Sequence, residues 1–228
     1  MILYHDLTQC SFLCRVNRFI ARCLLDGEEI TVHVKNTGRL RELLIPGALC
    51  WLEKSANPSR KTAYDLVAVE KDGRVINIDS QAPNLIAKEW VANGGWGDIT
   101  DLRSEYTHED SRFDLTYLRD GIRGLIEVKG VTLFDDNDMA IFPDAPTARG
   151  AKHLHGLIRA AQSGMETGLI FVIMKEDAVG FIPNQHTDPA FAAALREASA
   201  AGVHIVAACC RVTAEGAAIV HTVPVHLS

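Results

Sequence analysis

The sequence predicts an α/β chain of two domains, a small β-barrel over residues 1–83 and an α/β domain with a mixed sheet over residues 84–228. Three observations support this. Short strands punctuated by turn residues fill the first third of the chain, helices and apolar strands alternate in the remainder, and Pro83-Asn84 marks a junction. The chain has 228 residues, enough for one large or two small domains, and with 47% hydrophobic residues it can bury a substantial core.

The first domain shows β-type alternation. Ile30, Val32 and Val34 alternate with polar residues, and Asp26-Gly27 and Asp72-Gly73 provide turns. The expected strands are Arg18 to Leu25, Ile30 to Lys35, Ala48 to Glu53, Tyr64 to Glu70 and Val75 to Ile78. A helical turn is expected from Thr37 through Leu44, ended by Pro46-Gly47. Five strands with a helical insert favour a Greek-key barrel, for which the OB type is the candidate.

The second domain alternates helices with strands. Asn84 is expected to cap a helix from Leu85 to Ala92, and Asp188 to cap one from Pro189 to Ala201. A longer helix, Thr147 to Ser163, has an apolar stripe at helical spacing. The expected strands are Arg103 to Thr107, Ser111 to Leu118, Leu125 to Thr132, Leu169 to Met174 and Val203 to Cys209. This order predicts a mixed sheet.

Composition narrows the functional classes. The net charge is −6, so nucleic-acid binding would need a local basic surface. Residues 1–83 hold 11 Lys and Arg against 10 Asp and Glu, and residues 84–228 hold 12 against 19. The six cysteines form no zinc pattern. Without an apolar leader or a stretch of membrane-spanning length, we expect a cytoplasmic protein that does not associate with membranes.

A β-hairpin in the second domain carries the main chemical signal. Asp120-Gly121 is a two-residue turn signal between two strands. If these two residues form the turn, Asp114 lies directly opposite Glu127, and Lys129 lies on the same face. The other face would carry the apolar residues of both strands and be buried. Those residues are Phe113, Leu115, Tyr117, Ile126 and Val128.

Two carboxylates that face each other repel and destabilise a sheet. A divalent cation bound between them would offset this repulsion. Mg²⁺ or Mn²⁺ accepts one or two carboxylates plus waters, so Asp114 and Glu127 are the candidate metal ligands. Lys129 offers a compact positive charge to position an attacking water. The spacing resembles the core pattern of the PD-(D/E)XK nuclease superfamily. A solvated polar face on an edge hairpin would give the same alternation.

Two helices add candidates. Arg149 and His153, four residues apart, share a face near a helix N-terminus, and with Lys152 they could contact phosphate. A solvated basic helix face is the alternative. Glu89 is the candidate third acid, although it would also suit an exposed helix position, and Glu105 is the second choice.

Loops of the first domain concentrate basic residues. Lys35 and Arg39 lie in one loop, and Arg60 and Lys61 in another. Ordinary turn chemistry explains the Asn, Gly and Pro of these loops but not the clustered charges. We expect phosphate-backbone contacts to DNA here, which would not be sequence-specific.

With these residues in view, the chain resembles the sugar fermentation stimulation protein A (SfsA) family over nearly its whole length. The resemblance depends on the motifs at residues 36–39, 57–62, 83–84, 111–114, 127–129 and 142–153. It implies bacterial DNA-binding proteins linked to sugar-fermentation genes. It also implies an OB-like domain joined to a nuclease-like domain.

The first functional hypothesis is therefore a DNA-binding, metal-dependent phosphodiesterase. The second is a non-enzymatic DNA-binding regulator that uses a nuclease-like scaffold. A third is a binding module for an anionic metabolite at the helix N-terminus near Thr147. Substrate, strand preference and whether the chain forms a homodimer stay open.

Overall fold

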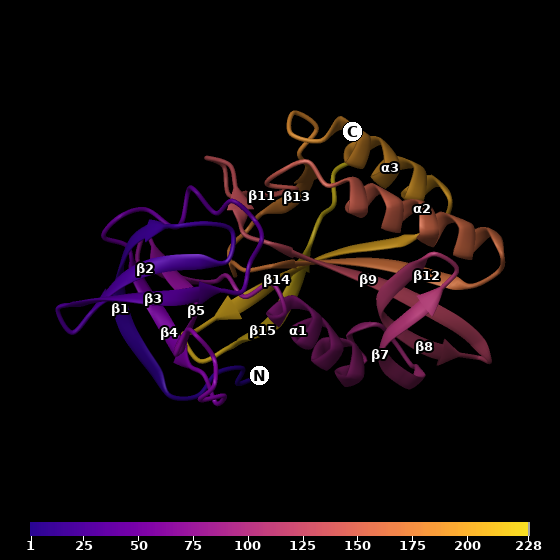
Figure 1. Cartoon of the computed structure of the whole chain (residues 1–228). Coiled ribbons are helices and arrows are strands. Elements are labelled where there is room, and N and C mark those ends of the chain that lie inside the picture. The colour runs from indigo at the N-terminus through magenta and orange to yellow at the C-terminus, as the bar shows by residue number, and fades with distance from the viewer. Residues whose placement is uncertain (228) are drawn as a thin grey trace. The chain divides into compact units, whose positions relative to one another are not determined.

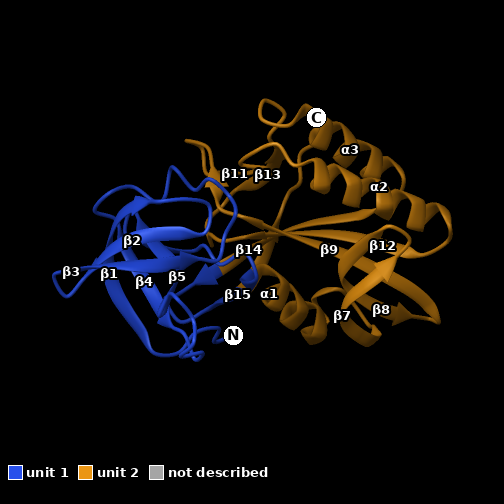
Figure 2. Cartoon of the chain, in the orientation of Figure 1, with its two compact units in different colours: residues 1–82, 211–218 blue, residues 83–210, 219–228 orange. Residues whose placement is uncertain are grey.

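The computed structural model describes residues 1–227 and contains two compact units (Figures 1 and 2). Unit 1 comprises Met1–Ala82 and Arg211–Ala218, and unit 2 comprises Pro83–Cys210 and the chain from Ile219 onward. The first break falls beside the expected junction. The short return of residues 211–218 to unit 1 was not expected.

Unit 1 is a closed β-barrel of the OB type. Its strands are β1 (Leu7–Arg15), β2 (Ile20–Leu25), β3 (Glu28–Val34), β4 (Leu49–Lys54), β5 (Tyr64–Lys71) and β6 (Arg74–Asn77). They are hydrogen-bonded in the order β3-β2-β1-β4-β5-β6, and a parallel pairing of β3 with β5 closes the first five into a barrel. The predicted barrel class is confirmed.

Two details of unit 1 differ from expectation. Strand β1 was not predicted, although its buried residues Cys10 and Phe12 alternate with partly exposed ones. β6 pairs with β5 outside the closed barrel, so the fifth strand of the barrel is β1 and not the strand expected from Val75 to Ile78. Of the helical turn expected from Thr37 through Leu44, only the last part forms: Leu44 N donates to the oxygen of Leu40 at 2.8 Å around a turn at residues 41–43, and residues 37–40 are irregular.

Unit 2 is built on a six-stranded mixed sheet ordered β15-β14-β12-β9-β8-β7. The strands are β7 (Thr100–His108), β8 (Ser111–Arg119), β9 (Ile122–Val131), β12 (Glu166–Ile173), β14 (His204–Val212) and β15 (Ala217–Val223). Neighbours β7, β8 and β9 are antiparallel, whereas β12 is parallel to both β9 and β14. A second sheet pairs β10 (Leu133–Phe134), β11 (Met139–Phe142) and β13 (Gly180–Pro183).

Helices cover both faces of the large sheet (Figure 1). α2 (Ala148–Gln162) and α3 (Pro189–Ala200) share a core with the apolar residues of one face. α1 (Ala82–Trp90), followed by a π-helical turn at Val91–Gly95, lies on the other side. No helix within residues 1–227 is long and apolar enough to span a membrane.

The cap predicted for α3 is confirmed, the cap predicted for α1 is wrong, and α2 has a cap that was not predicted. Thr147 Oγ1 accepts from Gly150 N at 3.0 Å, and Asp188 Oδ1 accepts from Phe191 N at 2.9 Å. α1 starts at Ala82, so Asn84 lies inside the helix and is not its cap. Helix formation tolerates a proline in its first turn, which lets α1 begin before Pro83. The side chain of Asn84 is thereby available for another contact.

Candidate active site

The hairpin of β8 and β9 forms in the predicted register. Asp120 and Gly121 have φ of 50° and 80°, as a type I′ turn requires, and pairing runs from Arg119↔Ile122 to Leu115↔Ile126. The next pair would join Asp114 to Glu127, but the backbone pairing stops before it. Asp114 Oδ2 instead accepts the backbone N–H of Val128 at 2.8 Å.

Beyond Leu115, where the β8–β9 pairing ends, the side chains of β8 no longer lie on the faces that the sequence predicts. Phe113 was expected on the face opposite Glu127, yet its ring lies 6.1 Å from that of His153 on α2, between centroids. It also shares the α2 core with Leu125. The strict alternation that held up to Leu115 does not extend to Phe113, because the β8–β9 pairing has ended there. Both faces are buried, and Glu127 is only 2% exposed.

Asp114 is held from two sides. Its Oδ1 accepts from Nδ2 of Asn84 on α1 at 2.8 Å, and its Oδ2 accepts from Val128 N. Burial, with a second contribution from the charge of Glu127, raises the pKa of Asp114 despite these donors. The ionised form is therefore disfavoured here, and a nearby cation would stabilise it.

Glu127 has one oxygen bound and one unused. Oε1 contacts both the ammonium of Lys129 and Nδ1 of His153. Burial alone would raise the pKa of Glu127, but Lys129 and His153 outweigh it and lower that pKa. Oε2 is buried without a hydrogen-bond partner among the described residues. A buried carboxylate oxygen without a partner is costly unless a ligand satisfies it.

His153 connects this site to the start of α2. A neutral imidazole with its proton on Nδ1 donates to Glu127 and leaves Nε2 to accept from Nε of exposed Arg149, at 3.4 Å. His153 is 6% exposed, so it orients the carboxylate and is not presented to solvent. This differs from the expected phosphate contact. Arg149 keeps that candidate role.

Not every predicted residue joins the site. Lys152 contacts Asp110 in the β7–β8 turn, with Nζ at 3.1 Å from Oδ2 and 3.0 Å from the backbone oxygen. Within residues 1–227 no three acidic, histidine or cysteine side chains gather into a metal-binding cluster, so Glu89 does not complete a set with Asp114 and Glu127. α1 presents Asn84 to Asp114.

The residues present nevertheless fit a divalent cation that keeps several waters. Mg²⁺ is commonly bound by one or two carboxylates together with water and substrate phosphate oxygens. The unused oxygen of Glu127 and the raised pKa of Asp114 are the observations that favour this fit. Mn²⁺ takes similar ligands.

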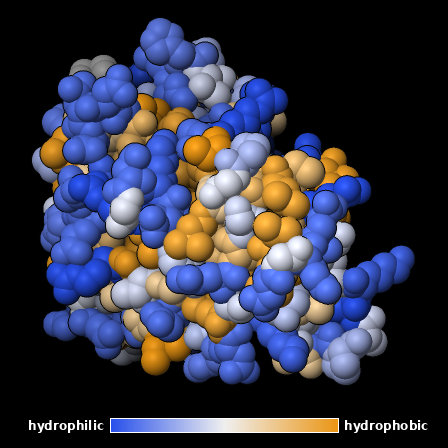
Figure 3. Space-filling view, turned by 90° about the vertical axis from the view of Figure 1, so that its left-hand side faces the viewer, coloured by the Kyte–Doolittle hydropathy of each residue, from blue (hydrophilic) through white to orange (hydrophobic). Residues whose placement is uncertain are grey.

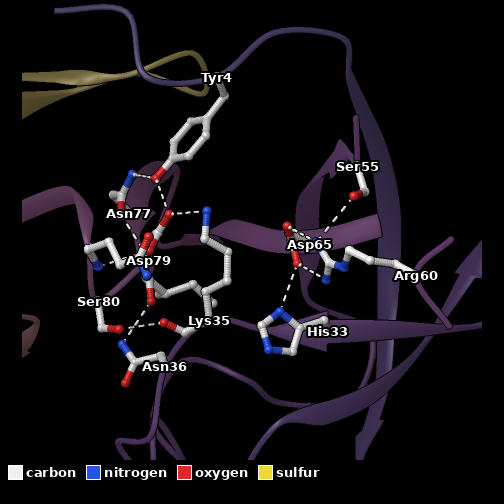
Figure 4. Close-up of polar contacts among 12 residues, drawn as sticks. Tyr4, His33, Lys35, Asn36, Ser55, Arg60, Asp65, Asn77, Asp79 and Ser80 are labelled. Carbon is white, nitrogen blue, oxygen red and sulfur yellow. Dashed lines mark hydrogen bonds and ion pairs between the residues drawn. The ribbon is translucent and has the colours of Figure 1, made fainter. Parts of the chain in front are cut away.

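Two residues of unit 1 that were predicted to bind phosphate instead form ion pairs with buried carboxylates (Figure 4). Lys35 Nζ lies 2.6 Å from Oδ2 of Asp79. Arg60 donates to both oxygens of Asp65, at 2.7 and 2.8 Å, and His33 Nδ1 lies 2.8 Å from the same group. Both cations are thus directed at carboxylates of the barrel in this structure. Arg39 and Lys61 are exposed.

Two family models cover most of the chain. The model of the sugar fermentation stimulation protein RE domain matches residues 81–216, and the SfsA N-terminal OB domain matches residues 13–78. The chain belongs to the SfsA family. A curated SfsA homolog of Desulfitobacterium hafniense (strain DSM 10664 / DCB-2) is 46% identical over 211 residues, 92% of each chain. One of Clostridium perfringens (strain 13 / Type A) is 44% identical over 220 residues, 95% of each.

A solved SfsA structure has the same fold. It is the structure of Pyrococcus furiosus SfsA in complex with Ca²⁺, with 28% sequence identity and a TM-score of 0.86. The match covers 99% of this chain and 98% of that one. The mixed α/β domain and the OB barrel are thus features that this chain has in common with another SfsA protein.

Sequence reasoning missed one residue of the site. Asn84 was assigned to a helix cap, whereas its amide holds Asp114. The helix begins three residues earlier than the sequence predicts, at Ala82 instead of Leu85, and this shift decides what the side chain of Asn84 reaches.

Proposed function

We propose that this SfsA protein is a metal-dependent phosphodiesterase that acts on nucleic acid, with DNA as the expected substrate. The observation that carries the proposal is the buried, unpaired Oε2 of Glu127 beside an Asp114 whose pKa is raised. That P. furiosus SfsA was solved in complex with Ca²⁺, a cation that prefers oxygen ligands, supports a cation site in the family.

The proposed chemistry assigns a role to each side chain. Asp114 and Glu127 would hold Mg²⁺ or Mn²⁺, which when bound lowers the pKa of water and stabilises charge on the phosphoryl oxygens. Lys129, which contacts Glu127 and whose side chain is 18% exposed, would orient the attacking water. Asn84 and His153 keep the two carboxylates in position. Arg149 contacts the phosphate.

The second candidate is a DNA-binding regulator without catalysis. The absence of a three-acid cluster within residues 1–227 favours it, because fewer ligands hold a cation less firmly. The six cysteines are all free thiols, which suits the cytoplasmic location that we propose in either case.

A cleavage assay separates the two. Single- and double-stranded DNA and RNA are incubated with Mg²⁺ or Mn²⁺ and wild-type protein, Asp114→Ala or Glu127→Gln. Asp110→Asn is the control, because it removes an exposed carboxylate that lies outside the site. We expect cleavage by the wild type and the control, and a loss of about 100-fold or more in the other two. If the wild type never exceeds Asp114→Ala, the enzymatic function is wrong.

A further inference from the structure

Two loops of unit 1 are tied into one surface by Arg15. Its guanidinium donates to the backbone oxygens of Arg18 at 2.7 Å, Asn36 at 2.5 Å and Gly38 at 2.6 Å. These bonds join the β1–β2 turn to the loop that follows β3. We call residues 16–19 together with residues 36–41 the loop face.

The β1–β2 turn is held rigidly. Oδ1 of Asn17 accepts from the backbone nitrogens of Phe19 and Ile20, at 2.8 and 3.0 Å. The oxygen of Phe19 accepts from Val34 N at 2.8 Å. The backbone of Phe19 is therefore fixed from both sides, and its ring stands on a preorganised turn.

The loop face exposes apolar and cationic groups side by side. Phe19 is 51% exposed and Val16 52% exposed. Arg18, Arg39 and Arg41 are exposed as well. On the side of the molecule shown in Figure 3, apolar surface lies open between hydrophilic side chains. Phe19 and Val16 lie three residues apart on one fixed turn beside exposed arginines, so the ring of Phe19 is available to contact a ligand.

The charge of the loop face is positive. The two segments that form it, residues 16–19 and 36–41, contain three arginines and no acidic residue, and Glu42 follows directly in the chain. A polyanion would be attracted by this excess. Lys35 and Arg60, which are paired with buried carboxylates, cannot supply that attraction without breaking their ion pairs.

We propose that the loop face binds single-stranded nucleic acid, with a base stacked on Phe19 and phosphates contacted by Arg18, Arg39 and Arg41. Aromatic rings flanked by cations are how proteins hold unpaired strands. In a duplex the bases stack on each other and are not available to Phe19. The inference deepens the nucleic-acid part of the proposed function and is independent of Asp114 and Glu127.

A second copy of the chain fits the loop face less well. A two-fold symmetric interface would bring the same arginines of both copies together, and their like charges would repel. A strand of phosphates instead places negative charge next to each arginine.

The test is a binding titration of the full chain in EDTA, followed by fluorescence anisotropy. The probes are labelled 20-nucleotide oligothymidine, oligouridine and a DNA duplex of equal length. Phe19→Ala should weaken binding of the single strands about fivefold or more, whereas Phe19→Trp should stay within about twofold of wild type. The oligothymidine and oligouridine arms show whether DNA or RNA is preferred.

Two further variants sharpen the test. Leu24→Ala removes another exposed apolar side chain, 40% exposed on β2, and should bind like wild type. Arg18→Gln combined with Arg41→Gln should reduce the slope of log affinity against log salt by about 1.4, since each phosphate contact to a single strand contributes about 0.7.

Three results would overturn the proposal: no binding of single strands by wild type, unchanged binding by Phe19→Ala, or tighter binding of the duplex. Because EDTA removes divalent cations, these results do not depend on metal binding by Asp114 and Glu127. A negative cleavage assay alone would not contradict nucleic-acid binding at the loop face.

Discussion

Asp114 and Glu127 are neighbouring carboxyl groups whose surroundings shift their pKa values in opposite directions. Burial and the charge of Glu127 raise the pKa of Asp114. Burial also acts on Glu127, but Lys129 and His153 outweigh it and lower that pKa. Two neighbouring acids whose pKa values are shifted in opposite directions are typical of catalytic and metal-binding sites, since each acid then favours a different protonation state.

The shift at Asp114 predicts an effect on stability with a definite sign. Because the folded pKa is raised, the folded protein releases this proton at a higher pH than the unfolded chain does. The resulting cost is absent below the unfolded value of about 3.9 and grows as pH rises through the folded pKa. Asp114→Asn should therefore unfold at a higher temperature than wild type at pH 7 in EDTA.

We expect a gain of about 2 to 4 °C, which corresponds to about 1 kcal/mol for a chain of this size. Near pH 3 the difference should vanish. Scanning calorimetry at both pH values measures it, and Asp110→Asn is the matched exposed control. If the asparagine variant melts at a lower temperature than wild type at pH 7, the surroundings of Asp114 do not disfavour its ionised form.

Much of the site could be predicted from individual residues of the sequence. The contacts that could not be predicted, those of Asn84 and His153, have a physical reason. The Asp-Gly turn fixed the register, so the nearness of Asp114 to Glu127 followed from sequence. The contact of Asn84 depended on where α1 begins, and the burial of His153 depended on which face of α2 packs against the sheet. Side-chain direction at these positions is set by tertiary packing, which a single sequence does not display.

At the scale of elements, α2 and α3 are tied together at their N-termini by Asp188. Its Oδ1 caps α3 through Phe191 N, and its Oδ2 accepts the backbone nitrogen of Thr147, which caps α2. One buried carboxylate thus satisfies groups at the starts of both helices. Since α2 carries His153, this link also helps to keep Glu127 oriented.

Asp188→Ala should cost about 2 kcal/mol of unfolding free energy, because a helix cap and a second hydrogen bond are lost, each worth about 1 kcal/mol. Asp188→Ser should cost about half as much, since serine still caps α3 but does not extend to Thr147. Urea unfolding followed by circular dichroism measures both. Equal losses in the two variants would contradict a bond that spans both helices.

At the scale of the whole molecule, the chain leaves unit 1 after Ala82 and returns to it at Arg211–Ala218 (Figure 2). The returning segment bonds to the N-terminus: Leu3 N and Tyr4 N donate to the oxygen of Glu215 at 2.8 and 3.0 Å. Ala214 packs against the cluster around Tyr4 and Trp51. Local patterns could not predict this return, because it pairs residues about 210 positions apart.

A fragment of residues 1–82 should therefore be less stable than unit 1 in the full chain. It loses the backbone bonds of Leu3 and Tyr4, each worth about 1 kcal/mol, and the packing of Ala214. Hydrogen exchange read by mass spectrometry should show faster exchange throughout β1 and β4 in the fragment. Identical protection in the two proteins would show that residues 211–218 add nothing to the barrel.

The central claim is that Asp114 and Glu127 hold a divalent cation, and Mn²⁺ binding followed by electron paramagnetic resonance tests it most directly. Wild type and Asp110→Asn should bind one ion with equal affinity, Asn84→Ala about 10- to 100-fold more weakly, and Glu127→Gln more weakly still. If Glu127→Gln binds Mn²⁺ as tightly as wild type does, the metal site is not at these carboxylates.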